Sequence, residues 1–267
     1  MLPSNFTEEP RLLSVQYLYA KNCLIQSIPT NICKYQNLVT LDLSNNQIQI
    51  VQKPNFNCLN NLITLQLSSN NLFSIEDYSF SNLTALQTLD LSNNKLLQLS
   101  EKVFDGLKSL KTLDLSNNKI NLIDRNSFVG SVYLTSLSLS NNALNSIDSF
   151  LPSSLQYLTT IKLDHNQISQ VPENVFNSFT SLYSLNLGSN IITKIFNKTF
   201  NNLRFLSSLN LSYNYLLTLD VSLFIGLSYL SSLNLDHNAI TELPEYVFTD
   251  LESLFSLDIS YNKIGKI

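Results

Sequence analysis

The sequence predicts an α/β solenoid, a curved stack of coils whose short strands form a parallel sheet on the concave face. Irregular or 3-10 segments are expected on the convex side. Three observations predict this fold: an Asn that recurs every 24 residues, Leu residues that alternate with polar ones just before it, and a later Phe column. Because one such repeat cannot bury its apolar side alone, the coils must stabilise one another.

The recurring Asn closes a block of the form LxxLxLxxN, and its 24-residue step continues without a slip through ten copies. A buried Asn amide can satisfy backbone groups of its own coil and of the neighbouring coil. We therefore expect a structural ladder made of Asn46, Asn70, Asn94, Asn118, Asn142, Asn166, Asn190, Asn214, Asn238 and Asn262.

Each repeat is expected to contribute one half-buried strand. Leu41 and Leu43 flank the polar Asp42, and such alternation is the signature of a strand with one buried face. Ile48 and Val51 are expected to return the chain through the core. The convex side is expected to be packed by Phe56, Phe80, Phe104, Phe128, Phe176, Phe200, Phe224 and Phe248.

The array is expected to span residues 15–267, after a lead-in of residues 1–14, with about eleven repeats. The first copy is degenerate, and Cys23 takes its Asn place as a small buried residue. The last copy is truncated, and no C-terminal cap is visible. Because natural solenoids cap their apolar ends, we expect the chain to be a fragment of a longer protein.

Composition narrows the classes of partner. Charged residues are only 13% of the chain and the net charge is −4, which argues against nucleic acid and anionic membranes as partners. No stretch reaches the roughly 18 apolar residues of a membrane span, so no membrane contact is expected from this segment itself. The N-terminus is too polar for a secretion signal.

The Phe column and the 24-residue period resemble the typical class of leucine-rich repeats, over residues 15–267. This class occurs mostly in extracellular proteins: Toll-like receptors, Slit-like proteins, hormone-receptor ectodomains and small proteoglycans. The resemblance implies a horseshoe-shaped recognition module at the cell surface or outside the cell, whose full-length protein is membrane-anchored or secreted.

Cys33 is assigned to the Phe place of its repeat and Cys58 lies two places after Phe56. The two should be neighbours on the convex side, either joined by a disulfide or packed as reduced, small hydrophobes. Sites for N-glycosylation occur at Asn5, Asn82, Asn197 and Asn210. Because Asn, Ser and Thr are abundant, four such sites do not by themselves indicate secretion.

No catalytic or metal-binding motif is evident, and no cofactor is expected. Asp164–His165 and Asp236–His237 look alike, but they lie three repeats apart, roughly 14 Å at the spacing of strands. No single acid–base step spans that distance. We interpret these residues as solvated polar groups at the strand exits and expect no enzymatic activity.

Exposed aromatic side chains are typical anchors of protein interfaces. They define a candidate lateral patch of Tyr183, Tyr213, His237, Phe255 and Tyr261, although these rings could also merely line the lip of the sheet. A second candidate is the acidic column of Asp42, Asp90 and Asp114, which would meet a basic partner or, as a repeat consensus, only water.

Three functions remain open from the sequence. The first is a receptor or adhesion ectodomain that binds a protein or other macromolecule. The second is a cytoplasmic scaffold that uses the same face, with reduced Cys and no glycan. The third is a specificity domain attached to a catalytic module elsewhere. The repeat class favours the first.

Overall fold

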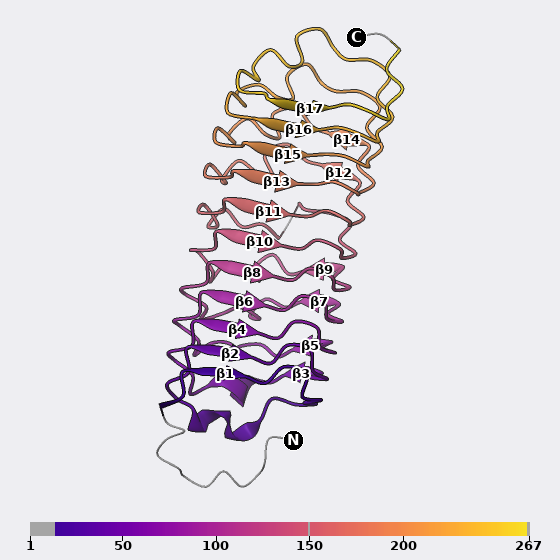
Figure 1. Cartoon of the computed structure of the whole chain (residues 1–267). Helices are drawn as coiled ribbons and strands as arrows, with labels where there is room; N and C mark the ends of the chain where they lie inside the picture. The colour runs from indigo at the N-terminus through magenta and orange to yellow at the C-terminus, as the bar shows by residue number, and fades with distance from the viewer. Residues whose placement is uncertain (1–13, 149, 266–267) are drawn as a thin grey trace. The chain divides into compact units, whose positions relative to one another are not determined.

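The computed structural model describes residues 14–148 and 150–265, except the side chain of Thr30. It divides into two compact units, residues 1–134 and 135–267. Both are built from coils of one kind, each with a short strand that pairs in parallel with the strand one repeat later (Figure 1). The predicted parallel-strand solenoid, with almost no helix, is confirmed.

Strand pairing follows the 24-residue period in both units, except that β1 and β2 pair at a step of 23 residues. Unit 1 contains β1 (Tyr17–Tyr19), β2 (Thr40–Asp42), β4 (Thr64–Gln66), β6 (Thr88–Asp90) and β8 (Thr112–Asp114). Unit 2 contains β10 (Ser136–Ser138), β11 (Thr160–Lys162), β13 (Ser184–Asn186), β15 (Ser208–Asn210), β16 (Ser232–Asn234) and β17 (Ser256–Asp258). Leu41, for example, lies opposite Leu65, so identical repeat places are in register.

The structure also contains a second set of strands that the sequence pattern did not predict. These are the parallel pairs β3 (Ile50–Val51) with β5 (Ser74–Ile75), β7 (Gln98–Leu99) with β9 (Leu122–Ile123), and β12 (Gln170–Val171) with β14 (Lys194–Ile195). In Figure 1 they lie beside the main strands. A two-residue strand is too short to show alternation, so only the stacking of coils defines it.

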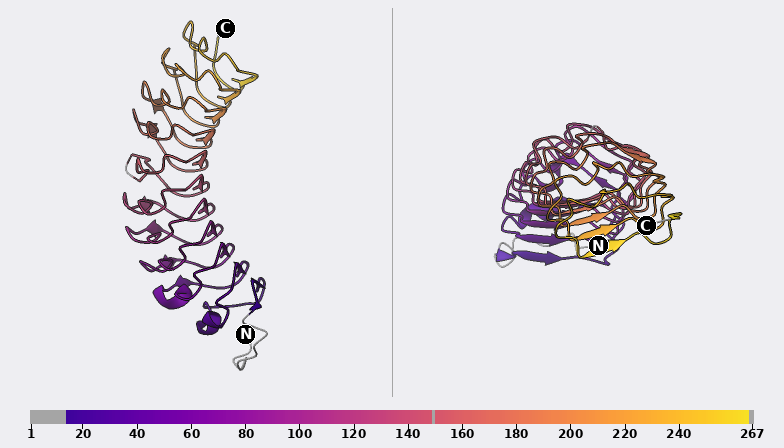
Figure 2. Two further views of the ribbon diagram at one scale, coloured as in Figure 1. Left: turned by 90° about the vertical axis from the view of Figure 1, so that its left-hand side faces the viewer. Right: turned by 90° about the horizontal axis from the view of Figure 1, so that it is seen from above.

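Helix is confined to single 3-10 turns where the structure describes the chain. The two that lie wholly within the described residues are η2 (Thr30–Lys34) and η3 (Lys53–Phe56), on the side of their coils away from the main strands (Figure 2). In η3, Pro54 occupies the first turn, where a missing N–H costs nothing. The remaining repeats cross this side as turns.

The core consists of Leu, Ile and Phe columns with almost no solvent exposure. Phe rings stack from coil to coil in unit 1, with centroid distances of 6.0 Å for Phe56–Phe80, 6.5 Å for Phe80–Phe104 and 5.6 Å for Phe104–Phe128. One assignment from the sequence was wrong by one place. Ile32, which is 1% exposed, fills the Phe place of its repeat, and the half-buried Cys33 follows it.

The Asn residues form a hydrogen-bonded ladder between coils. The Nδ2 of Asn70 donates to the carbonyl oxygens of Leu43, Leu67 and Ser68 at 2.9, 3.1 and 3.2 Å, and its Oδ1 accepts from the Ile48 amide at 2.9 Å. Two of these four groups belong to the preceding coil. The same pattern recurs at Asn94, Asn190, Asn214 and Asn238, among others.

The expectation that Cys23 is a buried ladder residue was wrong. Cys23 is exposed and unbridged, and its Sγ contacts only the Lys21 carbonyl oxygen, at 3.3 Å. A ladder side chain is buried because it bonds to carbonyls of the coil before its own, as Asn46 does to Ala20. No coil before that of Cys23 falls within residues 14–148, so its side chain has no such partners there.

Candidate ligand-recognition surface

The turn after each main strand determines where exposed side chains stand. The last strand residue caps this turn: the Oδ1 of Asp90 accepts from the Ser92 amide at 2.9 Å, and that of Asn210 accepts from the Ser212 amide at 2.9 Å. The residue just before the ladder Asn then adopts a left-handed backbone, as at Asn93, with a φ of 54°. We call this place in the repeat the left-handed position.

Four of the ten left-handed positions carry Asn, which tolerates positive φ well, and two carry Ser. The other four, all in unit 2, carry large rings: His165 (φ 54°), Tyr213 (52°), His237 (49°) and Tyr261 (51°). A Tyr in this conformation costs about 1–2 kcal/mol, which the contacts or the function of the ring must offset.

Three of these rings form a stacked ridge. Tyr213 and His237 lie with centroids 4.0 Å apart and planes inclined by 10°, and His237 and Tyr261 lie 4.1 Å apart with an inclination of 20°. Tyr213 is 53% exposed and Tyr261 is 73% exposed. We call Tyr213, His237 and Tyr261 the aromatic ridge; it presents a nearly continuous aromatic edge to solvent.

Carboxylates orient both His side chains. The Nδ1 of His237 lies 2.7 Å from Oδ2 of Asp236, and the Nδ1 of His165 lies 3.0 Å from Oδ2 of Asp164. Next to the ridge, the hydroxyl and the amide of Ser260 donate to Asp258 and lower the pKa of its carboxyl group, with a smaller contribution from His237.

The five predicted patch residues do not form one cluster. Tyr183 (58% exposed) and Phe255 (95% exposed) immediately precede the start of β13 and β17, whereas the ridge residues follow the strands. The sheet therefore separates two aromatic edges. Only Tyr213, His237 and Tyr261 are brought into ring contact.

The predicted acidic column mainly caps its own turns. The Oδ1 atoms of Asp42, Asp90 and Asp114 accept from the amides of the residues two places later, at 2.9, 2.9 and 2.8 Å. Asp42 is only 2% exposed and lies 3.7 Å from the Nζ of Lys21. As an exposed ligand contact, Asp42 was predicted wrongly, because the first coil covers it.

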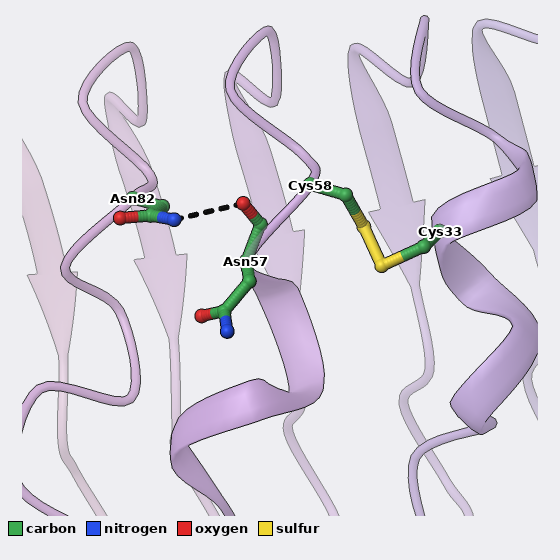
Figure 3. Close-up of a disulfide and its surroundings, with 4 residues drawn as sticks. All are labelled: Cys33, Asn57, Cys58 and Asn82. Atoms are coloured by element: carbon green, nitrogen blue, oxygen red, sulfur yellow. Dashed lines mark hydrogen bonds between the residues drawn. A yellow bond between two sulfur atoms is a disulfide. The ribbon is translucent and has the colours of Figure 1, made fainter.

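Cys33 and Cys58 form a disulfide in this structure, with their Cα atoms 5.4 Å apart (Figure 3). The bridge joins η2 to the segment just after η3, on the side away from the main strands. Asn82 lies nearby and is exposed, and its Nδ2 donates to the Asn57 carbonyl oxygen at 2.8 Å.

The other glycosylation sites differ in access. Asn197 is exposed, on a turn. Asn210 is partly buried in β15, and its Oδ1 already accepts from Ser212. Asn5 lies outside the described residues. Asn82 and Asn197 are therefore the sites whose side chains are most accessible to a modifying enzyme.

Within residues 14–148 and 150–265 no group of three or more His, Cys, Asp or Glu side chains converges as a metal site. In the same part of the chain, no helix has the length and apolarity needed to cross a bilayer. A shallow hollow in unit 2 is lined by Val221, Ile225, Tyr246, Val247, Thr249 and Asp250. Its one carboxylate, Asp250, accepts from the Gly226 amide at 3.0 Å.

Comparison with solved structures agrees with this geometry. A leucine-rich repeat protein of Leptospira interrogans is 33% identical, with a TM-score of 0.77, over 88% of this chain and 58% of that one. The Toll-like receptor TLR13, in a complex with a single-stranded RNA, is 29% identical, with a TM-score of 0.68, over 91% of this chain and 32% of the receptor. Toll of Drosophila, in a complex with Spatzle, has the same fold at 23% identity and a TM-score of 0.73, over 90% of this chain and 35% of Toll.

This chain thus spans from about a third to somewhat over half of the length of these proteins. No curated protein matches its sequence. The model of the leucine-rich repeat family matches seven overlapping segments: 36–96, 60–120, 84–144, 132–192, 156–216, 180–238 and 204–264. This fold is in general a protein-interaction fold without enzymatic activity of its own. From the repeat period, the coil geometry and these matches, the chain belongs to the leucine-rich repeat family.

Proposed function

We propose that this chain is a non-enzymatic recognition module of a cell-surface or secreted protein, and that it binds a macromolecular ligand through the aromatic ridge. The observation that carries the proposal is the exposed stack of Tyr213, His237 and Tyr261 on left-handed backbone. Exposed, rigid aromatic side chains are typical anchors of interfaces. Because a left-handed backbone disfavours Tyr, a ring at this place needs a compensating contribution, and we propose that ligand binding supplies it.

The disulfide of unit 1 supports the extracellular part of the proposal, and the low charge of the chain supports a protein as the ligand. Disulfides persist in oxidising compartments and are rare in the cytosol, and this one joins the first two described coils. A protein ligand fits a surface with few charges better than a polyanion does. TLR13 in its complex with RNA stands as the counter-example within the family, so nucleic acid is included in the test below.

A cytoplasmic scaffold is the second candidate, and the exposed free thiol of Cys23 favours it. A thiol of this kind is better tolerated in a reducing compartment. Expression of the chain through a secretory pathway and in the cytosol separates the two. We expect the secreted protein to carry N-glycans on Asn82 or Asn197, to show one free thiol by mass after alkylation, and to resist urea better than the cytosolic form. Bare sites, three free thiols and equal stabilities would favour the scaffold.

The ridge itself is tested by replacing Tyr213, His237 and Tyr261 with Asn, the residue that the same place carries in unit 1. The variant should keep the fold. A matched control replaces Asn45, Asn93 and Asn117 with Ser, which Ser69 shows to be compatible with this backbone. Against a panel of purified secreted proteins and single-stranded RNA, we expect binding that the ridge variant loses and the control keeps. Binding that survives in the ridge variant would place the recognition face elsewhere.

A further inference from the structure

The column of rings in unit 2 has one member missing. Five successive left-handed positions of unit 2 begin at residue 165. Four of them carry a ring: His165, Tyr213, His237 and Tyr261. The second of the five carries Ser189, with a φ of 52°. His165 repeats the arrangement of His237, with nearly the same φ and with its Nδ1 bonded to the Oδ2 of the preceding Asp. The two imidazoles thus stand on the same backbone conformation and share the same kind of carboxylate contact.

We infer that the space over Ser189 has about the width of one ring. Two steps separate the coil of His165 from that of Tyr213, which amounts to about 8 Å at the ring spacing of 4.0 and 4.1 Å within the ridge, or about 10 Å at the spacing of strands. We call this space, between His165 and Tyr213 and above Ser189, the ring slot. Both walls are exposed, at 57% for the His165 side chain and 53% for Tyr213. At its base Ser189 contributes only a hydroxymethyl group. The preceding residue, Gly188, has no side chain, and an added Cβ there would lie 2.8 Å from the Asn210 Nδ2.

The electrostatics of the slot favour a planar cation. The Oδ2 of Asp164 adjoins the His165 wall. The cation in the same coil as His165 is Lys162, exposed at the end of β11. A group at the centre of a slot of this width would lie about 4–5 Å from both ring centroids, inside the limit of about 6 Å for a cation–π contact.

We propose that the ring slot binds the guanidinium group of an arginine presented by a protein partner, stacked between His165 and Tyr213. Arginine is planar, stacks on aromatic faces and pairs with carboxylates, whereas the ammonium of lysine is a hydrated point charge. A nucleobase would fit the width, but the phosphates next to it would meet the carboxylate of Asp164. The proposal names the ligand chemistry of the recognition face proposed above, on which it rests.

The test is a titration with small probes, read on the histidines. The chain has only two His, so imidazole signals in protein labelled at His are assigned with a His165→Asn variant. The probes are the capped peptides Gly-Arg-Gly, Gly-Lys-Gly and Gly-Tyr-Gly, and uridine monophosphate. We expect the arginine peptide to shift the His165 signals saturably and more than those of His237, whose faces Tyr213 and Tyr261 cover. The lysine peptide should bind at least fivefold more weakly.

Filling the slot provides the decisive variant. Ser189→Tyr places a ring on a backbone that Tyr213 shows to be compatible with Tyr, and it should shift the His165 signals by itself and weaken the arginine peptide at least tenfold. The matched control is Ser69→Tyr, at a φ of 53° and between Asn45 and Asn93, which have no rings; it should change neither. No saturable shift with the arginine peptide, equal binding by Ser189→Tyr, or tighter binding of the tyrosine peptide or the nucleotide would overturn the proposal. Such a failure leaves the proposed function standing, because its glycan, thiol and ridge tests do not involve Ser189.

Discussion

One amide group, that of Asn70, makes four hydrogen bonds that join two coils. Its partners are backbone groups at a tight turn, where no strand or helix can satisfy them. A buried backbone group without a partner costs about 1–3 kcal/mol. The ladder residues are therefore the side chains on which the turns depend most, although they are small and polar.

We expect Asn70→Ala to lower the free energy of unfolding by about 3 kcal/mol, because it removes the bonds from Nδ2 to three carbonyl oxygens and the bond that Oδ1 accepts, at a residue that is 7% exposed. Urea unfolding followed by circular dichroism measures this loss. Asn60→Ala, at an exposed Asn, is the control and should change stability by less than about 0.5 kcal/mol. Equal effects of the two substitutions would contradict the structural role of the ladder.

Asp258 makes stability depend on pH. Hydrogen bonds from Ser260 lower its pKa in the folded state, so it contributes stability that is fully present above the ordinary carboxyl pKa of about 4. That contribution is lost as the pH falls through the lowered folded-state value. Asp258→Asn keeps an Oδ1 acceptor, as Asn186 does for Gly188 and Asn234 for Asp236. We expect the variant to have nearly the wild-type Tm at pH 7 and a smaller loss of Tm between pH 5 and pH 2. A pH profile identical to that of the wild type would exclude this role.

At the scale of elements, each strand is two or three residues long and each 3-10 turn spans four or five. Such pieces have no stability by themselves, since an isolated short strand or turn is marginal at best in water. Neighbouring coils supply what is missing through register, the Phe column and the ladder. The stability of a coil that is covalently linked to its neighbour should therefore depend on that link.

The Cys33–Cys58 bridge closes a loop with a sequence separation of 25. Replacing both residues by Ser should lower the free energy of unfolding by about 3 kcal/mol, mainly by freeing the unfolded chain. Hydrogen exchange should show faster opening of the coils of β1 and β2 than of those of β6 and β8. Cys23→Ser, at the free and exposed cysteine, is the control. A loss below about 1 kcal/mol in the double variant would mean that packing alone holds these coils.

At the scale of the whole molecule, the chain is apolar in its core and poor in charge, with 16 basic and 20 acidic residues. Among residues 14–148 and 150–265, Lys21–Asp42 and Lys102–Glu101 are the ion pairs that do not involve His. Each includes at least one exposed partner, and such pairs contribute little. The buried columns and the ladder therefore carry the stability.

We expect raising NaCl from 50 to 500 mM to change the Tm by less than about 2 °C, because salt screens exposed charges but leaves buried apolar contacts and hydrogen bonds in place. Differential scanning calorimetry measures this. Asn70→Ala should shift the Tm more than the whole salt series does. A fall of 5 °C or more with salt would show that ion pairs contribute more than the structure indicates.

Much of the repeat architecture could be predicted from the sequence, because a 24-residue period imposes the same environment on every residue at the same place. The candidate surface could be predicted only in part. Tyr213, His237 and Tyr261 were predicted as exposed, but their contact through the left-handed position was not. Nor could the pattern show that Tyr183 and Phe255 stand at the opposite edge.

By itself the sequence determined the class of fold, the strand register, the identity of the ladder and the nearness of Cys33 to Cys58, since all follow from period and alternation along one coil. Only the tertiary structure decided which polar side chains face the backbone and which face solvent. Asp42 is buried, Cys23 is exposed, and Ser189 interrupts a column of rings. These outcomes depend on what the adjacent coil presents at distances of a few ångströms, and a one-dimensional pattern does not contain that information.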